Sequence, residues 1–319
     1  MIPARRRPRP AMSYHAVASR SAAVVIDSYS TSFGWASRLL HQPERDHVRN
    51  IYALVRVADE IVDDPRVDLP AHQRAELLDA LQAETVRAMC TGWSTNLVVH
   101  AFAHTARRFG IGADLITPFF DSMRTDLDVS AHDSGSLDTY VHGSAEVVGL
   151  MCLRVFCAGD QRRYEHLAPG AIRLGAAFQK VNFLRDLGPD HDGLGRTYFP
   201  GLDPDAFTDG HRDMLLDDIE ADLRAAEAGL NELPPGSRRA VRAAHSLFGE
   251  LARTLRTTPA AQIRTSRVRV PNPTKGWIVA RTRPGRGPRR PPRSGRRRRR
   301  PPRSGRGPRP PRGRLRRSC

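Results

Sequence analysis

The sequence predicts an all-α protein with a single folded domain of roughly 265 residues. Apolar residues recur three and four positions apart through most of residues 19–257, which is the period of a helix with a buried face. Alternation of apolar and polar residues is missing except near Val268 and Val270, which briefly alternate with arginines. Because half-buried strands require that alternation, the two observations favour a helical bundle over a sheet-containing fold.

The predicted helices are bounded by the residues that interrupt these patterns. The first covers residues 19–40, with a break at residues 30–32. Pro43 opens the next segment, which ends at Asp64 because a residue that precedes proline disfavours the helical conformation. Further helices are predicted at 71–90, 94–109, 112–127, 135–158, 162–188, 204–230 and 236–257, with a loop at 193–200.

The net charge of +17 belongs to the C-terminal end of the chain. Residues 281–319 hold 18 Arg and no acidic residue, which leaves 33 basic and 34 acidic side chains before them. Such an Arg/Pro/Gly-rich composition buries too little apolar surface to become ordered. We therefore predict a disordered arm at 1–18, a folded domain at 19–280 and a disordered basic tail at 281–319. The tail is interpretable as a nucleic-acid or anionic-membrane contact, or as a solvated extension without function.

The cysteines and the apolar segments indicate the compartment. Cys90, Cys152, Cys157 and Cys319 have neither disulfide-framework nor metal-ligand spacing, so a reducing cytoplasm is expected. The basic N-terminus is not followed by the apolar run of a signal peptide. No stretch reaches 18 apolar residues, and we predict no membrane-spanning segment.

Residues 52–64 combine an apolar helix surface with charged side chains. Tyr52, Arg56, Asp59 and Asp63 are three or four residues apart and therefore share one face of the predicted helix. Apolar residues cover most of its remaining circumference, which is typical of a buried helix. Charges in such a place are normally paired with each other or bound to a metal.

A second cluster of this kind lies near the end of the predicted helix at 162–188. Its polar residues follow helical spacing and have an arginine beside them: Gln179, Asn182, Arg185, Asp186 and Asp190. The preceding residues 171–178 are mostly small and apolar, so this helix is also expected in the core. Pro189 disfavours the helical state at the residue before it, so we expect the helix to end near residue 187 and a turn to carry Asp190.

The two clusters together predict more than either alone. A single pair of carboxylates four residues apart is more often a solvated face than a site. Four buried carboxylates need several positive charges, and Mg²⁺, with Mn²⁺ as an alternative, binds carboxylate oxygens and leaves positions for phosphate oxygens. Arginines beside them suit a diphosphate. An apolar helical core behind such a site suits the ionisation of an allylic diphosphate, because a dry cavity protects the carbocation from water.

Both clusters resemble the aspartate-rich motifs of the squalene/phytoene synthase family, the head-to-head prenyl synthases. Other segments match in the same order: residues 29–33 (YSTSF) are similar to its N-terminal flap, residues 140–149 (YVHGSAEVVG) to its YxxxVAGxVG helix, residues 195–200 (GRTYFP) to its GRxYLP loop, and residues 267–271 (RVRVP) with Lys275 to its C-terminal end. The likeness covers about residues 20–280 and is greatest to the bacterial carotenoid-forming branch. It implies an isoprenoid synthase-type helical bundle around a central apolar cavity.

The resemblance also implies roles for individual residues. Those that would hold Mg²⁺ are Asp59, Asp63, Asn182, Asp186 and Asp190. Those that would contact the substrate are Ser30, Ser32, Phe33, Tyr52, Arg56, Gln179, Arg185, Arg196 and Phe248. Those with catalytic roles would be Tyr140, Arg56 and Arg185, of which Tyr140 would assist ionisation or proton removal.

Other interpretations remain open for several of these residues, and two positions depart from the family pattern. Tyr140 also fits a core tyrosine with a satisfied hydroxyl, Ser30 and Ser32 fit helix caps, and Arg196 fits a structural ion-pair partner. Glu146 stands where the family has glycine, so that either a close backbone approach is lost or this side chain faces elsewhere. Phe248 stands about where relatives carry a tyrosine.

The implied reaction is a phytoene synthase reaction. Two geranylgeranyl diphosphates condense through prephytoene diphosphate to phytoene and two diphosphates, and NADPH is not used. The alternatives are a squalene, dehydrosqualene or hydroxysqualene synthase acting on farnesyl diphosphate, an inactive family member that recruits partners, and a nucleic-acid-binding protein acting through the tail. We expect that the folded domain does not bind nucleic acid and that the protein is a monomer. We also expect a cytoplasmic location with loose peripheral contact to the membrane.

Overall fold

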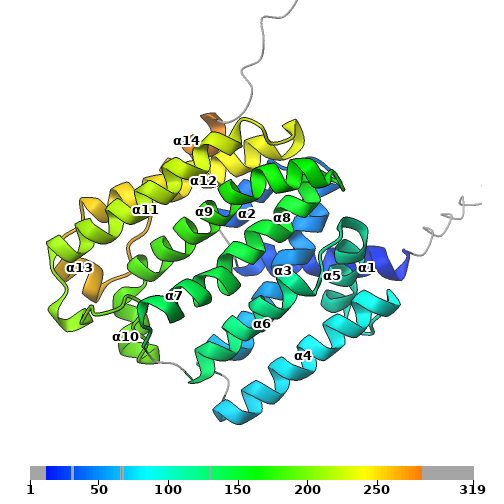
Figure 1. Ribbon diagram of the computed structural model, residues 1–319, viewed down its shortest axis with the longest axis horizontal. Coiled ribbons are helices and arrows are strands. Elements are labelled where there is room, and N and C mark those ends of the chain that lie inside the picture. The colour runs from blue at the N-terminus through cyan, green and yellow to red at the C-terminus, as the bar shows by residue number, and fades with distance from the viewer. Residues whose placement is uncertain (1–11, 30–31, 65, 67, 129–130, 282–319) are drawn as a thin grey trace, which may run out of the picture. The chain divides into compact units, whose positions relative to one another are not determined.

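The computed structural model describes residues 12–29, 32–64, 66, 68–128 and 131–281. Figure 1 shows that these residues are mainly helical. In the N-terminal half these are α1 (Tyr14–Tyr29), α2 (Ser32–Ser37), α3 (Glu44–Asp63), α4 (Ala71–Thr91), α5 (Leu97–Phe109) and α6 (Ala113–Asp128). They are followed by α7 (Ser134–Val141), the π-helical turn η1 (His142–Glu146), α8 (Val147–Cys157) and α9 (Gln161–Arg185). The last are α10 (Leu187–Leu194), the 3₁₀ turn η2 (Pro204–Ala206), α11 (Asp209–Leu230), α12 (Pro235–Arg256), α13 (Ala260–Thr265) and α14 (Asn272–Arg281).

The predicted all-α fold is confirmed in the part of the chain described. It contains no strand, and its β-type pairing is limited to an isolated bridge between Ala131 and Thr197. Figure 1 shows α4, α6, α8, α9 and α11 as successive neighbours, in agreement with the packing of α4 on α6, α6 on α8, α8 on α9 and α9 on α11. Each helix buries its apolar stripe against the next, which is the general solution for an amphipathic helix.

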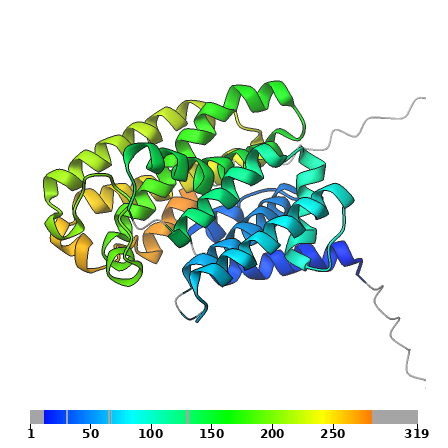
Figure 2. The ribbon, with the colours of Figure 1, turned by 60° about the horizontal axis from the view of Figure 1, so that its bottom comes forward.

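The helix α3 has the central position that its apolar surface predicts. It packs against α1, α4, α5, α6 and α8, and Figure 2 shows α1 beside this group. Ile51, Leu54 and Ala58 are fully buried in a core that also contains Phe102 and Phe119. The charged face of α3 is therefore held in place by packing on its other sides.

A second core surrounds the C-terminal half of α9, which carries the other polar cluster. Val181 and Leu184 of α9 pack with Leu216 and Ile219 of α11 and with Leu255 of α12. All the described residues belong to one compact unit. The two helices with the polar clusters share the first core, which contains Leu167 of α9, and only the C-terminal half of α9 belongs to the second.

Close packing near η1 depends on glycine. A Cβ on Gly143 would lie 2.0 Å from Ser122 Oγ and 2.2 Å from the carbonyl oxygen of Pro118, so α6 could not approach at this distance. A Cβ on Gly175 of α9 would lie 2.9 Å from the carbonyl oxygen of Ala145 and from Cα of Glu146. The close backbone approach is therefore kept, and its glycine is supplied by α9. The Glu146 side chain contacts His142 at 2.8 Å and does not line the cavity described below.

Several predicted boundaries are wrong. The arm was expected to be disordered to residue 18, but α1 begins at Tyr14, whose hydroxyl donates to the carbonyl oxygens of Ser94 and Thr95. The predicted helix at 204–230 begins at Asp209, because Thr208 caps it by accepting from the backbone N–H of His211. The predicted helix at 135–158 contains η1. Residues 1–11, the break at 30–31 and the tail from 282 lie outside the described residues.

The predicted end of the second polar helix also differs. The break occurs at Asp186, whose N–H bonds to the carbonyl oxygen of Asn182, and α10 then starts at Leu187. Pro189 lies in the first turn of α10, where a missing N–H costs nothing because those donors have no partner within the helix. Asp190 is therefore carried by a helix and not by a turn.

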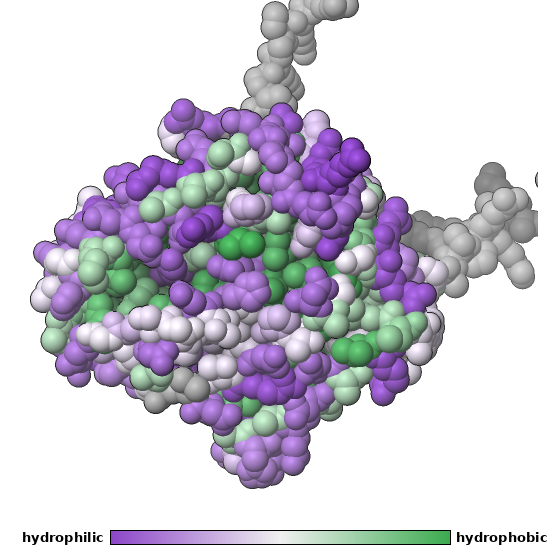
Figure 3. Space-filling view, in the orientation of Figure 1, coloured by the Kyte–Doolittle hydropathy of each residue, from purple (hydrophilic) through white to green (hydrophobic). Residues whose placement is uncertain are grey.

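One segment is long and apolar enough to cross a membrane. This segment, Ser134–Cys157, is 24 residues long, and half of its most apolar stretch is buried inside the protein. It packs between α6 and α9, so the core position accounts for its composition. On the face in Figure 3, hydrophilic side chains predominate and apolar ones show mainly in the hollows between helices.

Substitution of Gly143 tests the close packing at η1. Gly143→Ala should lower the free energy of unfolding by about 1–3 kcal/mol, because the new methyl group overlaps backbone that cannot move away cheaply. Gly249→Ala in α12 is the matched control, since nothing lies within 4 Å of its added Cβ. That variant should gain up to about 1 kcal/mol from helix propensity. Urea denaturation measures both, and equal effects would contradict this account.

Candidate functional site

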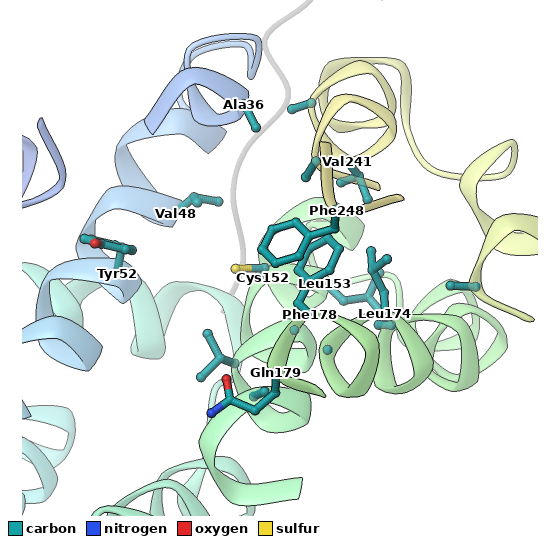
Figure 4. Close-up of a pocket in the computed structure, with 18 of the residues that line it drawn as sticks. Ala36, Val48, Tyr52, Cys152, Leu153, Leu174, Phe178, Gln179, Val241 and Phe248 are labelled. Atoms are coloured by element: carbon teal, nitrogen blue, oxygen red, sulfur yellow. The ribbon is translucent and has the colours of Figure 1, made fainter. Parts of the chain in front are cut away.

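A cavity of about 510 Å³ lies between α3, α8, α9 and α12, with further wall residues from α2 and α11. Figure 4 shows Phe178 and Phe248 near its centre, Val48 and Tyr52 of α3 on one side, and Leu174 and Val241 on the other. The two phenylalanine rings stack with centroids 3.8 Å apart. The walls are mainly apolar, which suits a hydrocarbon ligand.

The cavity changes character along α9. Leu167 lines it near the start of this helix, and Gln179, Asn182 and Arg185 line it near the end. Leu167 and Arg185 are about 27 Å apart along the helix axis, since an α-helix rises about 1.5 Å per residue. Small residues, among them Gly149, Gly170 and Gly175, keep the channel between them open. The cavity therefore has an apolar interior and a polar mouth.

Carboxylates from α3, α6 and α10 gather beside this mouth. Burial, followed by the nearby charge of Asp63, raises the pKa of Asp59. Burial, Asp186 and Asp63 raise the pKa of Asp190 to about 7. Burial is also the largest cause that raises the pKa of Asp126 to about 7. Each of these carboxyls thus lacks part of the positive charge that its ionised form requires.

Basic side chains gather at the same mouth. Arg185 and Arg267 both line the cavity, and both pair with Asp186, at 2.5 Å and 2.8 Å. Burial and then Arg185 lower the pKa of Arg267. Burial and then Arg185 lower the pKa of Lys275 as well. Burial and mutual repulsion therefore disfavour the charged forms of Arg267 and Lys275, just as burial and repulsion disfavour the ionised carboxylates.

Arg56 joins the two groups of charges. It pairs with Asp59 and Glu60 of its own helix, and its guanidinium lies 4.6 Å from the centre of the Tyr29 ring. Its Nε is buried without a hydrogen-bond partner among the described residues, while the side chain lines the cavity. An unsatisfied donor at a cavity wall is a ready contact for an anionic ligand.

The donor chemistry fits a hard divalent cation. The carboxylate oxygens of Asp59, Asp63 and Asp190 are the ligand type that Mg²⁺ takes. The raised pKa values of Asp59 and Asp190 reflect missing positive charge. Within the described ranges no three His, Cys, Asp or Glu side chains are arranged to hold an ion as they stand. Arg56 and Arg196 contact Asp59 and Asp63 instead.

The predicted substrate residues fall into three groups. The first lines the cavity as expected: Tyr52, Arg56, Gln179, Arg185 and Phe248, joined by the predicted metal ligand Asn182. The second lies outside what the structure describes, which is Ser30 itself and the side chains of Ser32 and Phe33. The third, Arg196 and the predicted catalytic Tyr140, lies off the cavity.

Tyr140 and Arg196 lie outside the wall of the cavity. Tyr140 is buried, does not line the cavity, and donates its hydroxyl to Asp126 Oδ1 at 2.7 Å. Arg196 is only 7% exposed and contacts Asp63 at 2.6 Å and Asp126 at 3.5 Å. Both side chains use their polar atoms in contacts inside the protein, and their predicted roles toward the substrate stay predictions.

Sequence reasoning missed Asp126 and undervalued Arg267. Asp126 follows Phe119 and Met123 at helical spacing on α6, so the period of the pattern already placed it on the buried face. Arg267 lies in an extended segment in which arginines alternate with the buried Val268 and Val270. This alternation was the sequence signal that Arg267 lies on a different face from the two valines. Ser144 in η1 was also missed, and its buried hydroxyl lines the cavity without a partner in the described structure.

Known proteins share this architecture and this sequence pattern. A family model described as squalene/phytoene synthase matches residues 26–274. A 15-cis-phytoene synthase from Paracoccus sp. is 30% identical over an alignment of 294 residues, and the alignment covers 82% of this chain and 92% of the relative. A dehydrosqualene synthase in complex with a ligand has a similar fold, with a TM-score of 0.72 at 19% identity over 84% of this chain and 96% of that one.

Two further relatives match over a shorter part. A presqualene diphosphate synthase from Rhodopseudomonas palustris is 30% identical over 172 residues, 53% of this chain and 58% of the relative. A 4,4'-diapophytoene synthase from Staphylococcus haemolyticus is 29% identical over 183 residues, 55% and 59% of the two chains. The matched stretch thus spans less than two thirds of both relatives, and the two have different names at similar identity.

The pKa of Asp190 predicts a stability change with pH. The folded-state value is about 7 against an ordinary 3.8, so the folded protein binds this proton more tightly. The contribution of Asp190 to the free energy of unfolding therefore falls as pH rises from about 4 to about 7. Asp190→Asn, which resembles the protonated form, should gain at least about 1 kcal/mol near pH 7.5 and little near pH 4.5. Urea denaturation without metal measures this.

Asp192→Asn in the same helix is the control. Its carboxylate is exposed and pairs with Arg264 at 2.8 Å, so its loss should not stabilise the protein at either pH. An Asp190→Asn variant with the same stability difference at both pH values would contradict the raised pKa.

Proposed function

The chain belongs to the squalene/phytoene synthase family, and we propose that it joins two molecules of geranylgeranyl diphosphate head to head to form phytoene and two diphosphates. The family establishes a prenyl-transferring enzyme type, and the proposal adds the substrate and the product. The 15-cis-phytoene synthase that matches over 82% of this chain supports that choice.

The observation that carries the proposal is the pair of unbalanced charge clusters at one end of an apolar cavity. The pKa of Asp190 is raised by burial and neighbouring carboxylates, whereas that of Arg267 is lowered by burial and a neighbouring arginine. A divalent cation bound together with a diphosphate supplies both missing charges at once. A hydrocarbon chain attached to that diphosphate extends into the apolar interior.

The basic side chains bind the diphosphate in this proposal. Arg185 and Arg267 present planar guanidiniums that can donate two parallel hydrogen bonds to phosphate oxygens. Arg56 adds its unpartnered Nε from the opposite wall. Tyr52 and Gln179 line the same region and orient the carbons next to the diphosphate.

Mg²⁺ would be held by Asp59, Asp63, Asn182, Asp186 and Asp190, and Mn²⁺ is the alternative ion. When bound, it supplies neutralisation of the charge that develops on the leaving diphosphate. The protein's own contribution is to place these carboxylates together at the polar end of the cavity, and bound positive charge would favour the ionised forms of Asp59 and Asp190, whose pKa values are raised. No NADPH is required in the proposed reaction.

The cavity protects the cationic intermediates from nucleophiles. Its interior is lined by side chains such as Leu174, Phe178 and Phe248, which exclude water. Cys152 also lines it, and burial raises the pKa of this thiol to about 12. The thiol therefore stays protonated and is a poor nucleophile toward a carbocation.

A reaction on farnesyl diphosphate is the second candidate. The relatives named presqualene diphosphate synthase and 4,4'-diapophytoene synthase match this chain at similar identity, though over less of its length. Residues such as Ala36, Ser37 and Gly175 leave room in the cavity, which favours the longer chain. We further propose a cytoplasmic monomer with loose membrane contact, since its substrates are lipids.

Product analysis tests the proposed function. Incubation with Mg²⁺ and geranylgeranyl diphosphate, without NADPH, should give phytoene with two diphosphates released per product. Farnesyl diphosphate in a parallel reaction should be used at least about tenfold less efficiently, which corresponds to about 1.4 kcal/mol of discrimination. Chromatography with mass spectrometry identifies the products. Preferential use of the shorter substrate would replace this proposal with the second candidate, and no diphosphate release from either would contradict both.

Removal of single carboxylates tests the assigned site. Asp59→Asn and Asp190→Asn should each lower Mg²⁺-dependent diphosphate release by roughly 10²–10³-fold, the usual cost of losing one preorganised electrostatic group. Asp64→Asn is the control, because this carboxylate pairs with Arg66 beyond the cluster and should leave the rate unchanged. Undiminished release by both site variants would rule out the assignment.

A further inference from the structure

Asp126 has no role in the proposed function, yet it is the most enclosed carboxylate near the site. Its side chain is 4% exposed, and it lies on α6, which supplies no wall of the cavity. The hydroxyl of Tyr140 donates to its Oδ1 at 2.7 Å. A buried carboxylate is costly unless it is paired, so its partners indicate what it is for.

The main partner of Asp126 is Arg196. One guanidinium nitrogen, Nη2, donates to the backbone carbonyl oxygen of Asp126 at 2.9 Å. The other, Nη1, lies 3.5 Å from the Asp126 carboxylate and 2.6 Å from the carboxylate of Asp63. The hydroxyl of Tyr198 lies 3.4 Å from the same Nη1. Arg196 is thus anchored on α6 and shared between a buried carboxylate and a carboxylate of the site.

Asp63 differs from Asp126 in its surroundings. The Asp63 side chain is 34% exposed and faces the cluster beside the cavity mouth, whereas Asp126 is enclosed. The close contact with Arg196 occupies one carboxylate oxygen of Asp63, and a charge-assisted hydrogen bond of this length competes with a cation for that oxygen. Asp126 is near enough to accept the same nitrogen after a small rotation of the guanidinium.

We infer that Asp126 is a positioning residue of the cation site, which holds Arg196 as an internal counter-ion to Asp63 and draws it back when a divalent cation binds. In the metal-free protein Arg196 offsets the repulsion among Asp59, Asp63 and Asp190. On cation binding, Asp63 exchanges this guanidinium for the ion, and Asp126 keeps Arg196 balanced. The inference rests on the proposed function for the presence of the cation site.

The ionised states are consistent with this exchange. The pKa of Asp126 is raised chiefly by burial, and the charge of Arg196 is the first cause that opposes the rise. Full transfer of Arg196 onto Asp126 therefore stabilises the carboxylate form. Replacing both members of such a buried pair with neutral groups is often tolerated, whereas removing one alone leaves an uncompensated charge.

Cation binding measured by calorimetry tests this role without requiring turnover. The probe is Mg²⁺ titrated into the full-length protein with inorganic diphosphate present. Asp126→Asn keeps an acceptor for Tyr140 but removes the charge, so Arg196 stays on Asp63 and Mg²⁺ affinity should fall by about tenfold or more. The double variant Asp126→Asn/Arg196→Met removes the competing guanidinium as well. Its affinity should return to within about threefold of the unsubstituted protein or exceed it.

Asp121→Asn is the matched control for charge. It removes one carboxylate from the same helix, at an exposed position paired with Arg124, and should leave Mg²⁺ affinity unchanged. Circular dichroism and thermal unfolding confirm that each variant is folded. If Asp126→Asn does not fold, the Mg²⁺ affinity of the double variant is the deciding measurement. The inference requires this affinity to be within about threefold of that of the unsubstituted protein, or higher.

Two results would overturn the inference. One is an Asp126→Asn variant that binds Mg²⁺ as tightly as Asp121→Asn does. The other is a double variant that binds no better than Asp126→Asn, which would give Asp126 a merely structural role. If the unsubstituted protein itself bound no Mg²⁺ with diphosphate, the proposed function would fail instead, so the two failures are distinguishable.

Discussion

The contact between Arg196 and two carboxylates is the interaction around which the site is organised. Asp63 comes from α3 and Asp126 from α6, and Arg196 follows α10, so one guanidinium connects three separate parts of the fold. Without it, carboxylates from α3, α6 and α10 would face one another with too little positive charge. The ion pair therefore allows the cluster to exist before any cation or diphosphate binds.

Helix packing explains why these charges can remain so close together. The apolar side of α3 is anchored through residues such as Leu54, and α9 is anchored in the same core through Leu167 and in a second core through Leu184. Gly143 and Gly175 let η1 approach α6 and α9 at distances that a side chain would prevent. The cavity lies between surfaces that packing has already fixed, so ligand binding does not have to assemble them.

Much of the candidate site was predictable from spacing along single helices. Tyr52 and Arg56 line the cavity from α3, and Gln179, Asn182 and Arg185 line it from α9, because residues three or four apart share a helix face. The contact that Arg196 and Tyr140 share with Asp126 was not predictable, because Asp126 is 70 and 14 residues away from them in the sequence. A hydrogen bond between helices leaves no periodic signal in either of them.

By itself, the sequence determined the helical class, the two polar clusters and the resemblance to a family, since all three depend on local periodicity and residue order. The tertiary structure decided which charges oppose one another across the cavity mouth. It also decided that Arg196 is shared between Asp63 and Asp126, that α10 carries Asp190, and that Arg267 reaches the cavity. Electrostatic energy depends on distance in space and on burial, and neither quantity is set until the helices have packed.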